Sequence, residues 1–99
     1  APPPSINGDD LARKVSTQCE KLAKPLAGKR VDLYATGSRD NNAVDKVVRC
    51  ECRARPSVCR DALAAYSVCH KAVMSVGAFN GQAHCGEQLK ALMSCLGLV

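Results

Sequence analysis

Four of the seven cysteines in this 99-residue chain stand at matched spacings, which constrains the fold more than any other feature. Nine residues separate Cys59 from Cys69, and nine separate Cys85 from Cys95. Ten residues of helix rise about 15 Å, whereas a disulfide joins Cα atoms at most about 7 Å apart, so neither pair closes within one helix. Two antiparallel helices connected through residues 77–81 bring Cys59 level with Cys95 and Cys69 level with Cys85. We therefore expect these two disulfides, each stabilising the fold by roughly 3 kcal/mol.

Metal binding is the competing interpretation of the same four cysteines. Structural zinc sites usually bring ligands in pairs two to four residues apart, and a nine-residue spacing on a helix cannot direct two thiolates at one ion. The spacing therefore disfavours zinc, and no cofactor is expected. Buried reduced cysteines are the remaining alternative, and they would leave the matched spacing unexplained.

Hydrophobic periodicity places both cysteine pairs on helices. Apolar residues at three- and four-residue steps predict one helix that opens at Pro56, takes Ser57 as its N-cap and ends before Gly77. The same pattern predicts a last helix over about 82–96, terminated by Gly97.

The N-terminal half carries weaker signals. The prolines near the start predict an extended arm over 1–7. A helix is expected over about 9–23, coil over 29–40, and a short helical turn capped by Asn41 or Asn42.

The predicted architecture is all-α, with a helical hairpin over 57–99 and an arm, a helix and a basic irregular segment over 1–56. The chain has no Trp, one Phe and two Tyr, so an aromatic-filled core is not expected. Because 1–8 and 26–56 are predicted to be irregular, we expect these segments to become ordered against a partner.

The segments CRDALAAYSVC and CGEQLKALMSC resemble the twin Cys-x9-Cys motifs of the coiled-coil-helix-coiled-coil-helix (CHCH) family. The resemblance covers about 40 residues and implies a mitochondrial protein, usually of the intermembrane space, that is oxidised during import and lacks a cleaved presequence. An Ala1 that follows a removed Met would suit that. Family members carry a hydrophobic docking signal beside a cysteine, and Leu63 and Tyr66 ahead of Cys69 are similar to it. The alternative role for Tyr66 is packing between the two helices.

Three further cysteines, Cys19, Cys50 and Cys52, separate classes of function. The structural interpretation pairs Cys19 with Cys50 or Cys52, and three unpaired thiols are another possibility. Cys50-Glu51-Cys52 is also a soft-ligand pair suited to Cu(I), in partial resemblance to the copper chaperone of cytochrome c oxidase. A third interpretation is thiol–disulfide exchange, as in the disulfide-relay oxidoreductase, although Glu51 stands where that enzyme has proline.

The net charge is +5, and Arg49, Arg53 and Arg55 crowd one short segment ahead of the hairpin. They are candidates for contact with RNA phosphates or with an acidic partner, whereas the alternative is a solvated surface that aids solubility. Aromatic residues are scarce here, so backbone contact is favoured over base stacking.

His70 and His84 are expected at the surface, because adjacency to a cysteine in sequence does not create a Cys–His catalytic pair. No apolar run approaches the roughly 18 residues of a membrane span. We therefore expect no enzyme, no small-molecule substrate, and a structural subunit of a large mitochondrial assembly with other protein subunits as partners. The basic arm is similar to that of the CHCH subunit of the mitochondrial ribosomal small subunit. The alternative assemblies are a respiratory complex or the ATP synthase on the intermembrane-space side.

Overall fold

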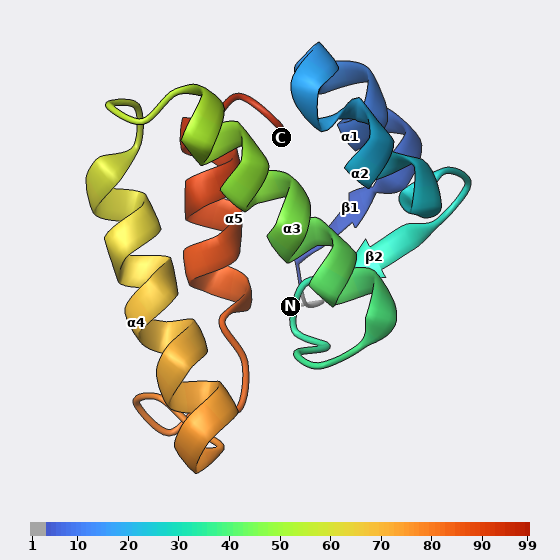
Figure 1. The fold of residues 1–99 in the computed structure, drawn as a ribbon. Helices are drawn as coiled ribbons and strands as arrows, with labels where there is room; N and C mark the ends of the chain where they lie inside the picture. Colours follow the sequence, from blue (N-terminus) through green and yellow to red (C-terminus); the bar gives the residue numbers. More distant parts are fainter. Residues whose placement is uncertain (1–3) are drawn as a thin grey trace.

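The computed structural model describes residues 4–99, and over this range the protein is mostly helical, with one small sheet and three disulfides (Figure 1). The helices are α1 (Gly8–Lys14), α2 (Glu20–Ala23), α3 (Arg39–Ala54), α4 (Arg60–Val76) and α5 (Gly86–Cys95); the strands are β1 (Ser5–Asn7) and β2 (Arg30–Asp32); 3-10 turns cover Thr17–Cys19 and Lys24–Leu26. Part of the predicted N-terminal arm, residues 1–3, lies outside the described residues.

The two-stranded sheet corrects the prediction of an all-α fold. β1 and β2 pair antiparallel with Ile6 opposite Val31, and both side chains are buried. The coil predicted over 29–40 is therefore wrong at 30–32, and also at 39–40, where α3 begins; the extended arm predicted over 1–7 is a strand at 5–7. Strands this short carry too little alternation to be recognised, and they are defined by pairing with chain 25 residues away.

The helix predicted over 9–23 is interrupted. Asn7 caps α1 by accepting the backbone N–H of Asp9 at 2.8 Å, but α1 ends at Lys14 because Val15 is extended (φ −73°, ψ 153°). The next N–H, that of Ser16, donates to Glu51 Oε1 at 2.6 Å. A side chain from α3 thus satisfies a backbone group that a continuous helix would have used.

The segment that the sequence predicts to be irregular, 26–56, contains the 16-residue α3. Its N-cap is Ser38, rather than Asn41 or Asn42, and Ser38 Oγ accepts the N–H of Asn41 at 3.0 Å. Valine, asparagine, aspartate and cysteine make up nine of its sixteen residues and have only modest intrinsic helix propensity. Burial of one face stabilises it instead, through Val44, Val47, Val48, Glu51 and Cys52.

The helical hairpin is present as α4 and α5, with different starting points. α4 begins at Arg60 and not at the predicted N-cap Ser57, with Cys59 in the left-handed region (φ 62°) just before it. α5 begins at Gly86 rather than near 82, because Phe79 and Gln82 exchange two backbone hydrogen bonds in a turn. Gly77 and Gly97, both at positive φ, follow the two helices as predicted.

One hydrophobic core joins the N-terminal part to the hairpin. Leu11 and Leu26 from the first segments pack in the same cluster as Val47 of α3 and Leu89 and Leu92 of α5. α3 lies across the middle of the molecule and contacts both parts (Figure 1). Within residues 4–99 no helix combines the length and apolar character needed to cross a membrane.

Candidate functional site

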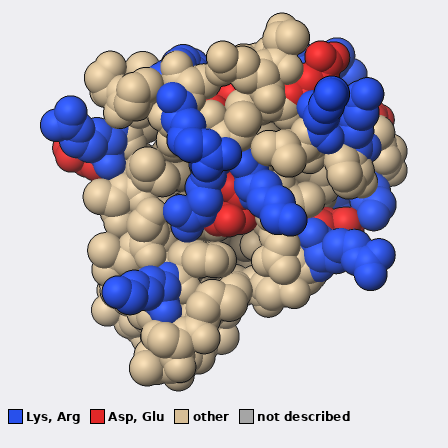
Figure 2. Space-filling view, in the orientation of Figure 1, with Lys and Arg blue, Asp and Glu red and all other residues tan. Residues whose placement is uncertain are grey.

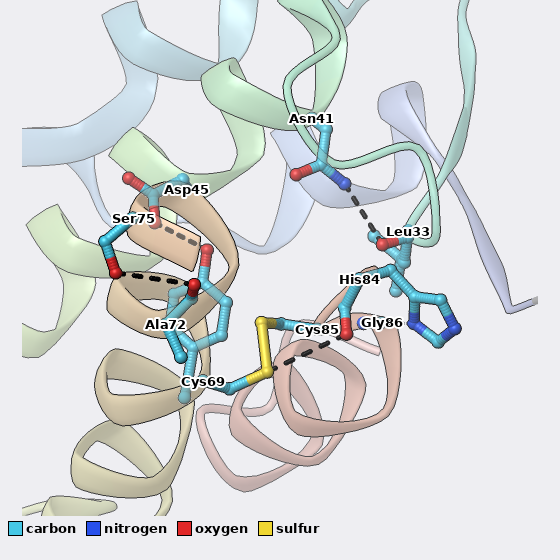
Figure 3. Close-up of a disulfide and its surroundings, with 10 residues drawn as sticks. Leu33, Asn41, Asp45, Cys69, Ala72, Ser75, His84, Cys85 and Gly86 are labelled. Atoms are coloured by element: carbon cyan, nitrogen blue, oxygen red, sulfur yellow. Dashed lines mark hydrogen bonds between the residues drawn. A yellow bond between two sulfur atoms is a disulfide. The ribbon is translucent and has the colours of Figure 1, made fainter. Parts of the chain in front are cut away.

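The hairpin cysteines form the two disulfides that their spacing predicts. Cys59 joins Cys95 and Cys69 joins Cys85, with Cα separations of 5.8 and 5.9 Å. Figure 3 shows the second disulfide between α4 and the chain just before α5, with the His84 carbonyl oxygen 3.7 Å from the Cys69 sulfur. The two disulfides therefore join the two arms of the hairpin at two levels, ten residues apart along each arm.

The third disulfide joins Cys19 to Cys50, which is one of the two pairings left open by the sequence. It connects the 3-10 turn before α2 to α3. Cys50 therefore has no free thiol in this state, so Cys50 and Cys52 do not form a dithiol. Across residues 4–99, no group of three or more His, Cys, Asp or Glu side chains is arranged to hold a metal ion.

Cys52 is the unpaired cysteine of the seven, and it is buried on α3. Burial raises the pKa of its thiol; the charges of Arg49 and Arg55 lower it, without cancelling the effect of burial. Cys52, Arg49, Arg53, Pro56 and Leu63 line an open pocket of about 280 Å³. The thiolate, which is the reactive form of cysteine, is therefore disfavoured despite the nearby arginines.

Arg49 is engaged within the protein. Its Nε donates to both carboxylate oxygens of Asp45, at 3.0 and 3.1 Å, and its guanidinium carbon lies 5.6 Å from the centre of the Tyr66 ring. Tyr66 in turn donates its hydroxyl to Asp45 Oδ1 at 2.6 Å. Burial, and secondly this hydrogen bond, raise the pKa of Tyr66 well above its ordinary value. The three side chains connect α3 to α4.

Arg55 is engaged as well, through a buried carboxylate. Its guanidinium donates to Glu51 Oε2 at 3.0 Å and to the carbonyl oxygen of Leu96 at 2.9 Å. Glu51 is 1% exposed and also accepts the Ser16 N–H, so this carboxylate and its arginine connect three segments far apart in the sequence. Leaving such a carboxylate without its cation would be costly.

Arg53 differs from the other two predicted arginines. It is exposed, and no ion pair or hydrogen bond of its side chain occurs among the described residues. The prediction that all three arginines contact RNA or an acidic partner stays a prediction, but two of the three guanidinium groups already serve the fold.

The residues of the predicted import signal lie in the interior. Tyr66 is 1% exposed, Cys69 is buried, and Leu63 is half-buried beside the core. A docking role before folding stays a prediction, while in the folded protein these side chains pack between helices.

The two histidines are half-buried and lie near aromatic rings. His84 stacks on Tyr34, with ring centres 3.8 Å apart, and His70 lies 5.6 Å from the Tyr66 ring centre. Tyr34 donates its hydroxyl to Glu87 Oε1 at 2.8 Å, and this hydrogen bond is the main cause of its raised pKa. The chain after β2 is thereby attached to the start of α5.

A second basic region was missed by the sequence analysis. Lys21 of α2 and Arg39 and Lys46 of α3 line an open groove of about 580 Å³. The signal that could have found it is the seven-residue spacing of Arg39, Lys46 and Arg53, which becomes informative once the segment is taken as one helix.

No protein-family model, curated protein or solved structure matches the chain.

Proposed function

We propose that this protein is a non-catalytic structural subunit of a large mitochondrial assembly, of the twin Cys-x9-Cys kind that its hairpin resembles. The favoured assembly is the small subunit of the mitochondrial ribosome, where the chain would contact rRNA and neighbouring proteins. In this role the chain holds its protein-binding and RNA-binding surfaces in fixed positions. A small disulfide-bonded domain can do so without a catalytic site.

The observation that carries the proposal is the exposed apolar surface of α4. Val68, Met74 and Val76 are 58%, 50% and 78% exposed, although α4 is packed on α5. Exposed apolar side chains gathered on one helix are typical of a surface that a neighbouring protein covers. The disulfides at both ends of the hairpin support the proposal, since they keep this helix in place.

The choice of a ribosome rests on charge. Arg53 has no ion-pair or hydrogen-bond partner among the described residues, and Figure 2 shows Lys and Arg side chains, with some Asp and Glu between them, along the diagonal that α3 takes in Figure 1. A basic surface beside an apolar one suits a subunit that contacts both RNA and protein.

The alternative is an accessory subunit of a respiratory complex or of the ATP synthase, facing the intermembrane space. Three disulfides among seven cysteines favour an oxidising compartment, which supports this alternative specifically. In it, the apolar surface of α4 would face a membrane-complex subunit and the basic surface would face solvent.

Sedimentation of the tagged protein from lysed mitochondria tests the proposal. We expect it to travel with the small ribosomal subunit at low salt and to be released by high salt. Migration with an inner-membrane complex in mild detergent would favour the alternative, and migration as a free monomer under all conditions would overturn both.

Two matched variants sharpen that experiment. Val68→Ser with Val76→Ser removes apolar surface from α4, and we expect the double variant to leave the assembly while remaining folded. Val58→Ser with Val99→Ser makes the same change at valines that are 39% and 44% exposed elsewhere, and it should stay assembled. Equal loss in both variants would contradict a specific role for α4.

A separate variant tests the thiol-exchange and copper alternatives. Both require Cys52, because Cys50 is bonded to Cys19. We expect Cys52→Ser to leave assembly unchanged and the purified protein to retain no Cu(I). Copper retained at one ion per chain, and lost in the variant, would establish the chaperone alternative instead.

A further inference from the structure

The groove between α2 and α3 is lined by three cations and by apolar side chains. Its lining includes the exposed side chains of Lys21, Arg39 and Lys46, and the half-buried side chains of Leu22 and Ala43. No carboxylate is among the residues that line this groove. Three positive charges therefore face one open space of about 580 Å³ without a neutralising partner inside it.

The carboxylates nearest to these cations along α3 already form ion pairs with other residues. Asp40 pairs with Lys29 at 3.0 Å, and Asp45 pairs with Arg49. Arg39, Lys21 and Lys46 form no ion pair within residues 4–99. The groove therefore keeps its positive potential, and the start of the 16-residue α3, with its partial positive charge, adds to it.

The cations continue beyond the groove as a row on one side of α3. Arg39, Lys46 and Arg53 recur every seven residues, which is 20° short of two helical turns, so each step advances about 10 Å on nearly the same face. A single small anion could contact only one end of such a row. An extended polyanion could contact all of it.

The lining residues indicate how such a polyanion would be held. The groove contains no aromatic side chain on which a base could stack, and its polar groups are lysine, arginine and the amide of Asn42. Lysine and arginine bind phosphate by charge, and arginine also by paired hydrogen bonds. Such a surface reads the backbone and not the sequence of bases.

We propose that the groove of Lys21, Arg39 and Lys46, extended by Arg53, binds the phosphodiester backbone of a nucleic acid strand. This site shares Arg53 with the three arginines predicted from the sequence, and it leaves out Arg49 and Arg55, which are bonded within the protein. It deepens the proposed function, on which it rests, because it names the groove and the phosphodiester chemistry through which the chain would contact RNA.

The test measures binding of the oxidised full-length chain to a fluorescein-labelled 20-nucleotide RNA of mixed sequence, by anisotropy over a range of salt. The variant K21Q/R39Q/K46Q removes the groove cations. The matched control R60Q/K71Q/K90Q removes the same number and kinds of charge from exposed positions on α4 and α5. Circular dichroism of both variants verifies that they are folded.

We expect the groove variant to lose about tenfold or more in affinity at low salt, and its salt dependence to flatten by about two units of slope, as counterion release from single strands requires. The control should lose less than threefold. A single-stranded DNA of the same sequence should bind with similar affinity, because the site contacts the backbone.

Equal losses in the two variants would overturn the proposal, because binding would then follow net charge alone. Groove-dependent binding to phosphatidylglycerol vesicles with none to RNA would also overturn it, in favour of a membrane surface. RNA binding without ribosome co-sedimentation would leave the groove established and the proposed function contradicted. If the groove variant still co-sediments with the ribosome and the native chain binds no RNA, the groove proposal is contradicted and the proposed function stands.

Discussion

In the hairpin, two disulfides join α4 to α5 at both ends of a ten-residue interval, whereas residues 4–54 contain one internal disulfide. The N-terminal part depends more on polar contacts. There a buried carboxylate, Glu51, accepts hydrogen bonds from Ser16 and Arg55, and Arg55 reaches the end of α5. The hairpin is thus held by covalent bonds at regular positions, and the rest by contacts that exist only when all segments are in place.

The largest effect should come from removing the covalent support of the hairpin. Replacing all four hairpin cysteines with serine opens loops of 36 and 16 residues, and we expect a loss of about 6 to 7 kcal/mol in the free energy of unfolding. Cys19→Ser with Cys50→Ser opens one loop of 31 residues and should cost about 3 to 4 kcal/mol. Urea unfolding followed by circular dichroism measures both. Comparable losses would remove the distinction between the two regions.

Substitutions of Arg55 and Arg53 test how much the ion pair of the buried Glu51 carboxylate contributes to stability. Arg55→Ala leaves the Glu51 carboxylate buried without its cation and should cost about 2 to 3 kcal/mol, reduced from a fully buried pair because Arg55 is 42% exposed. Arg53→Ala, two residues away and unpaired, should cost less than about 0.5 kcal/mol. Similar values from urea unfolding would mean that the N-terminal part does not depend on this ion pair.

Gly86 tests the contact between the two regions. A Cβ at this position would overlap the ring of Tyr34, so we expect Gly86→Ala to cost about 1 to 3 kcal/mol. The same substitution in a Tyr34→Ala background should cost less, because the ring is gone. A double-mutant cycle from thermal unfolding measures the coupling, and a coupling of zero would show that this contact is not tight in solution.

Tyr66 gives the smallest effect, and it depends on pH. Its pKa is raised on folding, so the folded state holds the proton more tightly, and the resulting stability is present below the ordinary tyrosine pKa near 10 and is lost above it. Between pH 10 and 11, the free energy of unfolding should fall by about 1 kcal/mol more in the native sequence than in Tyr66→Phe. Tyr34→Phe, at an exposed hydroxyl, is the control and should change the pH profile less. Parallel profiles for all three would contradict the buried Asp45 contact.

The disulfides of the hairpin could be predicted because helix rise converts sequence spacing directly into distance. Cys59 and Cys69 must lie nearly three turns apart on one rod, whatever surrounds them. The starts of the two helices differ from the prediction, since Cys59 lies at positive φ and a turn at Phe79 precedes α5, and neither follows from residues 57 or 82 alone.

α3 and the sheet could not be predicted because their causes lie elsewhere in the chain. α3 contains valine, asparagine and aspartate, which have only modest helix propensity, and it depends on burying Val44, Val47 and Val48 against the core. β2 needs β1 as its partner. The groove of Lys21 and Arg39 follows from the same packing, so the seven-residue spacing of the cations on α3 becomes a signal only when this segment is known to be one helix.

The burial of Cys52 affects how long the three disulfides keep their pairing. One unpaired thiol in a chain with three disulfides can attack any of them and exchange the pairings, and the attack needs the thiolate. Burial on α3 raises the pKa of this thiol and so keeps it protonated, although Cys52 borders an open pocket. The three disulfides therefore persist partly because the seventh cysteine is buried and stays protonated.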